Sequence, residues 1–181
     1  RARLTQLLVV GIRAARVGVP ADFDLQLGPL AQHLADRHDV TVLTSCATDY
    51  VTWQNVLARG PSSDGRVNVV RFPVDRPRHL NRFRELSELV FAGRATPGEQ
   101  EAWFRANGPS LPGLLAHLDR EGGSYDRVLF WSFRYAPTWF GLPRVADRRP
   151  NLRPLHERAP ALPNQQPLPR HRSRRLPVEP R

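Results

Sequence analysis

The sequence HDVTVLTSCATDYVTW, residues 38–53, indicates the fold because a short apolar strand is followed directly by polar and aromatic side chains. Residues 40–43 are preceded by charged groups and followed by hydroxyl groups, which is typical of a buried strand that ends at the edge of a sheet. Side chains able to contact a ligand come next: Thr44, Ser45, Cys46, Asp49, Tyr50 and Trp53. This stretch therefore predicts a binding loop at the end of a strand.

The flanking sequence predicts further strands and helices in alternation. Apolar runs predict strands at 7–10, 67–72 and 128–131, and helical spacing predicts helices at 25–37, 81–91, 111–120 and 136–146. Thr96-Pro97-Gly98-Glu99 has the form of a capping box and predicts the start of another helix. Because the strands are mostly apolar rather than alternating, we predict an α/β, Rossmann-like parallel sheet with helices on both faces.

Two more loops resemble the one after residues 40–43. Right-handed crossovers place the carboxyl ends of parallel strands at one edge of the sheet, where ligands bind in such folds. Asp75, Arg76 and Arg78 follow strand 67–72, and Ser132, Phe133, Arg134 and Tyr135 follow strand 128–131. We predict that the three loops meet at one rim, with these candidate substrate-binding residues: Ser45, Asp49, Tyr50, Trp53, Ser132, Arg134 and Tyr135.

Charge and composition separate the chain into two parts. All 27 basic residues are arginine, and the net charge is +10. Segment 148–181 has nine arginines and two acids, so +7 of that charge lies there and +3 in residues 1–147. The single cysteine, Cys46, and the lack of an apolar run near roughly 18 residues predict a cytoplasmic protein, either free or peripheral at the inner face of the membrane.

Three segments together resemble the N-terminal domain of family 4-like glycosyltransferases of the GT-B fold. They are LAQHLADRHDVTVLTSCATDYVTW at 30–53, VNVVRFPVDRPR at 67–78 and YDRVLFWSFRYAPTWFGLP at 125–143. The resemblance implies a retaining transfer of a sugar from a nucleotide-sugar donor to an acceptor. The part present here, residues 1–147, supplies mainly the acceptor side of the cleft. No metal or other cofactor is indicated, and no catalytic residue is assigned.

The sequence departs from the family pattern in two places. The Gly-Gly pair expected between the first strand and first helix is replaced by RAARVGVPADFDLQLGP, residues 13–29, with a single candidate in Gly18. The second domain, which in the family binds the donor and has two Glu separated by seven residues, is not recognised in the sequence. We therefore expect a sheet truncated before its last strands, and an isolated chain that is an inactive fragment of the enzyme.

Each candidate residue has a second interpretation. Asp49 either accepts a hydrogen bond from a sugar hydroxyl or caps a helix within 50–57. Tyr50 and Trp53 either stack on a sugar ring or pack against the sheet. Arg134 either meets a phosphate or carboxylate or forms a surface ion pair, and Ser132 either contacts the ligand or forms a turn. Arg76 and Arg78 are interpreted as solvated loop charges.

Segment 148–181 differs in character from the rest, with eight prolines among 34 residues and no aromatic residue. Such a composition predicts a disordered tail. One interpretation is that the tail arises from a shifted reading frame in GC-rich DNA. The other is that it is a selected basic segment, which makes the chain a non-enzymatic protein that binds nucleic acid through its arginines.

Overall fold

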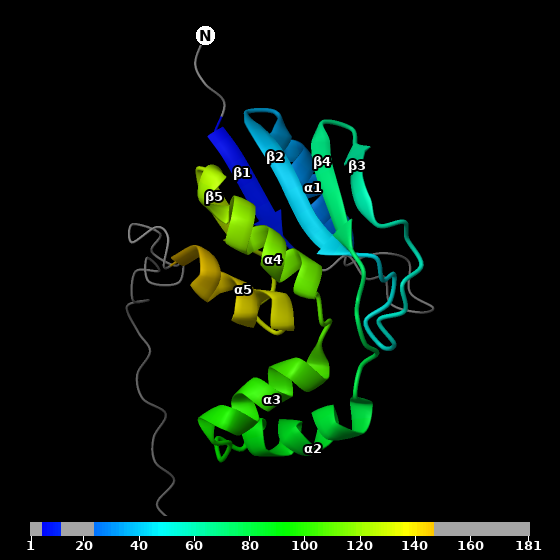
Figure 1. Ribbon diagram of the computed structural model, residues 1–181, viewed down its shortest axis with the longest axis vertical. Coiled ribbons are helices and arrows are strands. Elements are labelled where there is room, and N and C mark those ends of the chain that lie inside the picture. Colours follow the sequence, from blue (N-terminus) through cyan, green and yellow to red (C-terminus); the bar gives the residue numbers. More distant parts are fainter. Residues whose placement is uncertain (1–4, 12–23, 147–181) are drawn as a thin grey trace, which may run out of the picture.

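The computed structural model describes residues 5–11 and 24–146, and the following elements lie within these ranges (Figure 1). The strands are β1 (Thr5–Val10), β2 (His38–Ser45), β3 (Gly60–Asp64), β4 (Val67–Phe72) and β5 (Arg127–Phe130). The helices are α1 (Asp24–Ala35), α2 (Leu80–Phe91), α3 (Pro97–Asn107), α4 (Pro112–Glu121) and α5 (Ala136–Ala146), with a short 3-10 turn, η1, at Gly122–Ser124.

The strands form one sheet in the order β3-β4-β2-β1-β5. The four strands β4, β2, β1 and β5 run parallel to one another, so their carboxyl ends lie at one edge. β3 is antiparallel to β4 and joined to it by a turn at Gly65, whose φ of 58° favours glycine. The sequence did not predict β3, because GPSSD has no apolar residue and lies exposed at the sheet edge.

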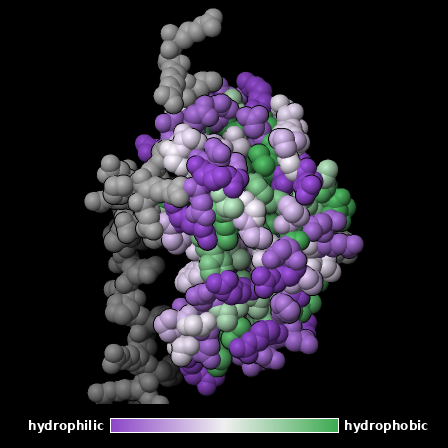
Figure 2. All heavy atoms as spheres, viewed as in Figure 1, coloured by the Kyte–Doolittle hydropathy of each residue, from purple (hydrophilic) through white to green (hydrophobic). Residues whose placement is uncertain are grey.

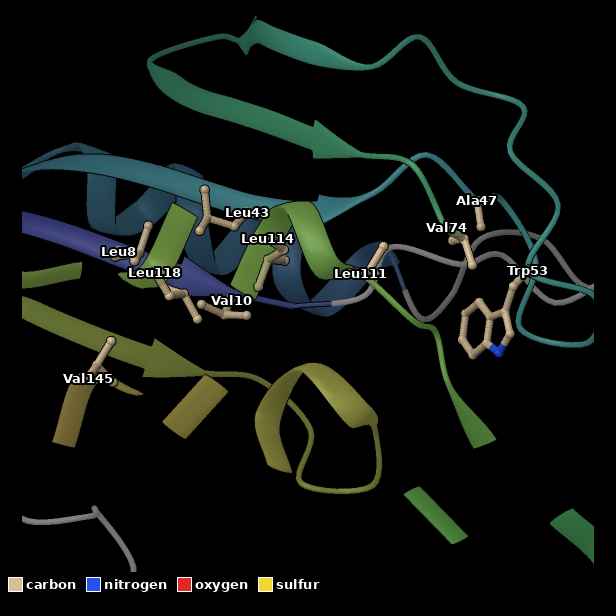
Figure 3. Close-up of a cluster of buried hydrophobic side chains, with 10 residues drawn as sticks. All are labelled: Leu8, Val10, Leu43, Ala47, Trp53, Val74, Leu111, Leu114, Leu118 and Val145. Carbon is tan, nitrogen blue, oxygen red and sulfur yellow. The ribbon is translucent and has the colours of Figure 1, made fainter. Parts of the chain in front are cut away.

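Helices cover both faces of the sheet, which confirms the predicted α/β fold. Alternate residues along each strand point to opposite faces. One face packs against α4 and α5 through Leu8, Val10, Leu43, Leu114, Leu118 and Val145 (Figure 3). The other packs against α1 through Val9, Val40, Val42, Val69, Leu27 and Ala31. The central strands read as continuous apolar runs because they are buried on both faces.

α2 and α3 form a helical hairpin beyond the carboxyl ends of the strands (Figure 1). Its core contains Leu86, Trp103 and Ala106. The predicted capping box is confirmed: Thr96 Oγ1 accepts from the Glu99 amide at 3.3 Å, and the Glu99 carboxylate accepts from the Thr96 amide at 2.8 Å. α5 contacts α3, so the hairpin is held close to the end of the sheet where α5 begins.

The surface mixes hydrophilic and apolar side chains on the face drawn in Figure 2. Within residues 5–11 and 24–146, none of the helices is long and apolar enough to cross a membrane. The predicted tail at 148–181 and most of the segment between β1 and α1 lie outside the described residues.

Candidate functional site

Asn107, at the end of α3, connects the loops that follow β2, β4 and β5. Its side chain is 2 % exposed. The Oδ1 atom accepts a hydrogen bond from Arg78, and Nδ2 donates to the Arg134 carbonyl at 2.7 Å. Its backbone carbonyl accepts from Trp53 Nε1 at 2.8 Å. The three loops therefore meet above the carboxyl edge of the sheet, with the end of α3 between them.

Arg78 is half-buried within this network, so its interpretation as a solvated loop charge is wrong. Its Nη1 donates to the Tyr50 carbonyl at 2.9 Å, and the guanidinium lies 4.3 Å from the centre of the Phe83 ring. Its Nε is buried and has no hydrogen-bond partner in the described part of the chain. Burial lowers the pKa of Arg78; nearby Tyr135 and Tyr50 act to raise it, and the positive charge of Arg134 acts to lower it.

Tyr135 lies where the β5 loop meets the β2 loop. Its ring contacts Trp53 edge-on, with 5.5 Å between ring centres and an interplanar angle of 85°. Burial raises the pKa of the Tyr135 hydroxyl and outweighs the opposite effect of Arg134 and Arg78. The hydroxyl is therefore neutral at physiological pH and is able to donate a hydrogen bond.

Trp53 packs in the core, which is the second of its two interpretations. Its side chain is 2 % exposed and extends the cluster of Leu8, Leu43 and Leu114 beyond the strand ends (Figure 3). Its backbone has a φ of 59°, which does not occur within a right-handed helix. Trp53 thus supports the rim from the core side, and its ring is buried within the protein.

Asp49 stabilises a turn, so its second interpretation, as the cap of a helix within 50–57, is wrong. Its carboxylate accepts from the Val51 amide at 2.7 Å and from the Thr52 amide and hydroxyl, both at 2.6 Å. Such local bonds favour a turn over a helix. Burial acts to raise the pKa of Asp49, but these bonds and one to the Gln54 amide outweigh it, so the pKa is lowered.

The remaining candidates differ in exposure. Ser45 is fully buried, and its Oγ accepts from the Ala47 amide at 3.3 Å. Ser132 is half-buried with a φ of 74°, and its carbonyl accepts from Thr138 Oγ1 at 2.6 Å. Arg134 is exposed, and the neighbouring Phe133 is 80 % exposed. Tyr135 lies close enough to Arg134 and Tyr50 for their charges to affect its pKa, so these three residues share the rim, whereas Ser45 is buried.

Asn107 was not identified from the sequence as a candidate site residue, and the only local signal beside it is the Gly108-Pro109 pair that follows. Gly108 has a φ of 72°, and its carbonyl accepts from the Ala136 amide at 3.1 Å. A Cβ at this position would lie 3.0 Å from Trp53 Nε1, so a larger residue would crowd the indole. The tight exit at Gly108 is what brings the Asn107 side chain next to the three loops.

A small cavity lies elsewhere, between α1 and the sheet. Its lining is mainly apolar, with two polar residues, and consists of Leu27, Gly28, Ala31, Gln32, Val42, Asp64, Val67 and Val69. Among the described residues, no group of three His, Cys, Asp or Glu is placed to hold a metal ion. The rim is therefore the stronger candidate site because its exposed groups can form hydrogen bonds and ion pairs.

Comparison of the chain with protein-family models, curated proteins and solved structures finds no match. The resemblance to family 4-like glycosyltransferases rests on the three sequence segments alone.

Proposed function

We propose that this chain is the acceptor-binding domain of a glycosyltransferase of the GT-B type, and that the acceptor lies on the rim beside Tyr50, Phe133, Arg134 and Tyr135. The observation that carries this proposal is the Asn107 network, which joins the loops after β2, β4 and β5 at the carboxyl edge of a parallel sheet. Ligands of doubly wound α/β proteins bind at this edge.

The chemistry of the rim suits a polyhydroxylated ligand. Phe133 offers an exposed ring face on which the apolar side of a sugar can stack. The neutral Tyr135 hydroxyl and the Arg134 guanidinium offer hydrogen-bond donors. Asp49 is a weak base at neutral pH, because the hydrogen bonds of the turn favour its ionised form and lower its pKa. We therefore assign acceptor binding, and not proton abstraction, to these loops.

The proposal is tested by sugar binding to the full chain, monitored by backbone amide NMR shifts. We expect methyl glucoside and methyl mannoside at millimolar concentrations to shift the amides of Ser132, Arg134 and Tyr135. Phe133→Ala should weaken this binding. Phe91→Ala is the matched control, because Phe91 is 71 % exposed at the far end of α2. Unchanged rim amides with every sugar would contradict the proposal.

A second experiment tests whether the chain binds only the acceptor and has no donor site. We expect the purified chain to show no sugar transfer from, and no hydrolysis of, UDP-glucose or GDP-mannose, because donor binding belongs to the second domain in the family it resembles. Substantial turnover of either donor, with first-order dependence on protein concentration, would show that the chain holds a donor site and would contradict this assignment.

A further inference from the structure

Neither arginine of the rim, Arg78 or Arg134, has an acidic partner among the described residues, whereas five other arginines do. Five guanidiniums form ion pairs with carboxylates: Arg66 with Asp36, Arg76 with Asp75, Arg82 with Glu85, Arg105 with Glu101, and Arg144 with Asp119. In the described ranges, Arg78 and Arg134 form none. The partners of Arg78 are the neutral oxygens of Tyr50 and Asn107. The Asn107 side chain joins the Arg78 guanidinium to the Arg134 carbonyl, so two arginines are neighbours at the rim, and neither forms an ion pair with a carboxylate of the described residues.

Such an arrangement costs free energy in the unliganded protein. Burial and the like charge of Arg134 both destabilise the charged form of Arg78. The buried Nε of Arg78 also lacks a hydrogen-bond partner among the described residues, although a buried donor is normally satisfied. A bound anion would offset the repulsion, and the planar guanidinium suits phosphate and carboxylate oxygens.

We propose that Arg78 and Arg134 form a subsite for an anionic group, a phosphate or a carboxylate, on the ligand of the rim. This inference rests on the proposed function, and it specifies that the acceptor is an acidic sugar derivative. Arg134 is exposed and makes the direct contact. Arg78 lies deeper, where Tyr50, Asn107 and the Phe83 ring hold it and its positive charge attracts the same group.

The backbone at the start of α5 does not provide the alternative anion site that a helix start often offers. The Ala136 amide donates to the Gly108 carbonyl, and the Thr138 amide donates to the Tyr135 carbonyl. Pro137 between them has no N–H group. Recognition of an anion at this rim therefore depends on the guanidinium groups, which single substitutions can test.

The experiment compares four probes on the full chain: methyl glucoside, glucuronate, glucose 6-phosphate and inorganic phosphate. Site-specific amide shifts are used, because the many arginines of 148–181 also attract anions. The test variant is Arg134→Gln, which changes an exposed side chain. The matched control is Arg127→Gln, because Arg127 is also exposed and begins β5 at the opposite edge of the sheet. Circular dichroism checks that both variants are folded.

We expect at least one acidic sugar to bind the rim more tightly than methyl glucoside. Arg134→Gln should weaken that binding by about tenfold, the loss of a charge-assisted hydrogen bond, and Arg127→Gln should leave it unchanged. Whether glucuronate or glucose 6-phosphate binds more tightly distinguishes a carboxylate ligand from a phosphate ligand.

Other outcomes separate this inference from the proposed function. Equal binding of neutral and acidic sugars, or equal effects of the two substitutions, would overturn the anion subsite and leave sugar binding supported. If inorganic phosphate shifts the rim in an Arg134-dependent way and no sugar does, the subsite stands and the proposed acceptor function is contradicted. If no anionic probe shifts the rim, the subsite is overturned, and the methyl glucoside result decides the proposed function.

Discussion

Leu114 and Asn107 are both buried, one against the face of the sheet and one above its carboxyl edge, but different forces stabilise them. Leu114 is 0 % exposed and packs in the apolar cluster between the sheet and α4. Asn107 is 2 % exposed and forms hydrogen bonds to the Arg78 guanidinium, the Arg134 carbonyl and Trp53. Apolar burial is non-directional and tolerates some rearrangement, whereas hydrogen bonds fix positions and are costly to leave unmade.

The comparison indicates that apolar packing against the sheet provides most of the stability. The hydrogen bonds of the rim fix the positions of the three loops relative to one another. A change in the core should lower the free energy of unfolding strongly and leave the geometry of the loops nearly intact in the molecules that remain folded. A change in the rim network should cost less stability but disturb the positions of Arg78, Arg134 and Tyr135 relative to one another. The four substitutions below test this distinction.

Leu114→Ala should have the largest effect. It removes three carbon atoms from the fully buried cluster and leaves a cavity, which costs about 2–5 kcal/mol of unfolding free energy. The measurement is equilibrium denaturation in urea. Val56→Ala is the control, because Val56 is 62 % exposed, and its effect should stay within about 0.5 kcal/mol. Equal effects of the two changes would contradict the assignment of Leu114 to the core.

Asn107→Ala should have the next largest effect on stability and the largest on the rim. It leaves the buried part of Arg78 and the Arg134 carbonyl without their partner, at a cost of about 2–3 kcal/mol. NMR shifts of the Tyr135 and Ser132 amides should change more than they do in Leu114→Ala. Asn68→Ala is the matched control, since Asn68 is exposed on β4. A rim spectrum unaltered by Asn107→Ala would show that Asn107 does not position the loops.

Trp53→Phe should cost less, about 1–2 kcal/mol, because an aromatic ring is kept and one hydrogen bond is lost. The Asn107 carbonyl would remain buried without the indole N–H. Urea denaturation measures the cost, and Trp103→Phe provides a comparison, because Trp103 Nε1 donates to the Ser87 hydroxyl in the separate α2–α3 core. Only the Trp53 change should alter the amide shifts of Tyr135. A shift of Tyr135 in both variants would contradict the local role of Trp53.

The same contrast explains what the sequence could predict. β2 and β4 follow from apolar runs of residues adjacent in the chain, and the Thr96 capping box follows from two residues three apart. The rim depends on long-range contacts instead. Trp53 and Asn107 are 54 residues apart, and Arg78 and Asn107 are 29 apart. No local pattern indicates that Asn107 would accept a hydrogen bond from Arg78.

The errors in the prediction share a physical cause. The interpretation of Asp49 as a helix cap within 50–57 is wrong because the same carboxylate also stabilises a turn, and the burial of Trp53 favours the turn. β3 was missed because its residues are polar and its strand character comes from pairing with β4. In both segments, contacts with the rest of the fold override local preference.

Asp49→Asn should have the smallest effect and is distinguished by its pH dependence. The lowered pKa means that the folded state favours the ionised carboxylate, so its contribution is present above the unfolded pKa of about 3.9 and is lost as the pH falls through the lower folded value. Because Asn keeps one acceptor oxygen and the site is partly solvated, the difference at neutral pH should be below about 1 kcal/mol. Urea denaturation of both proteins from neutral pH to pH about 3 should show the difference in unfolding free energy shrinking with acid.

An NMR titration of the Asp49 carboxyl group should give a midpoint below the unfolded value. A midpoint at or above that value would show that the turn does not hold the ionised form, and the rim would then be supported by Asn107 and Trp53 without the β2 turn.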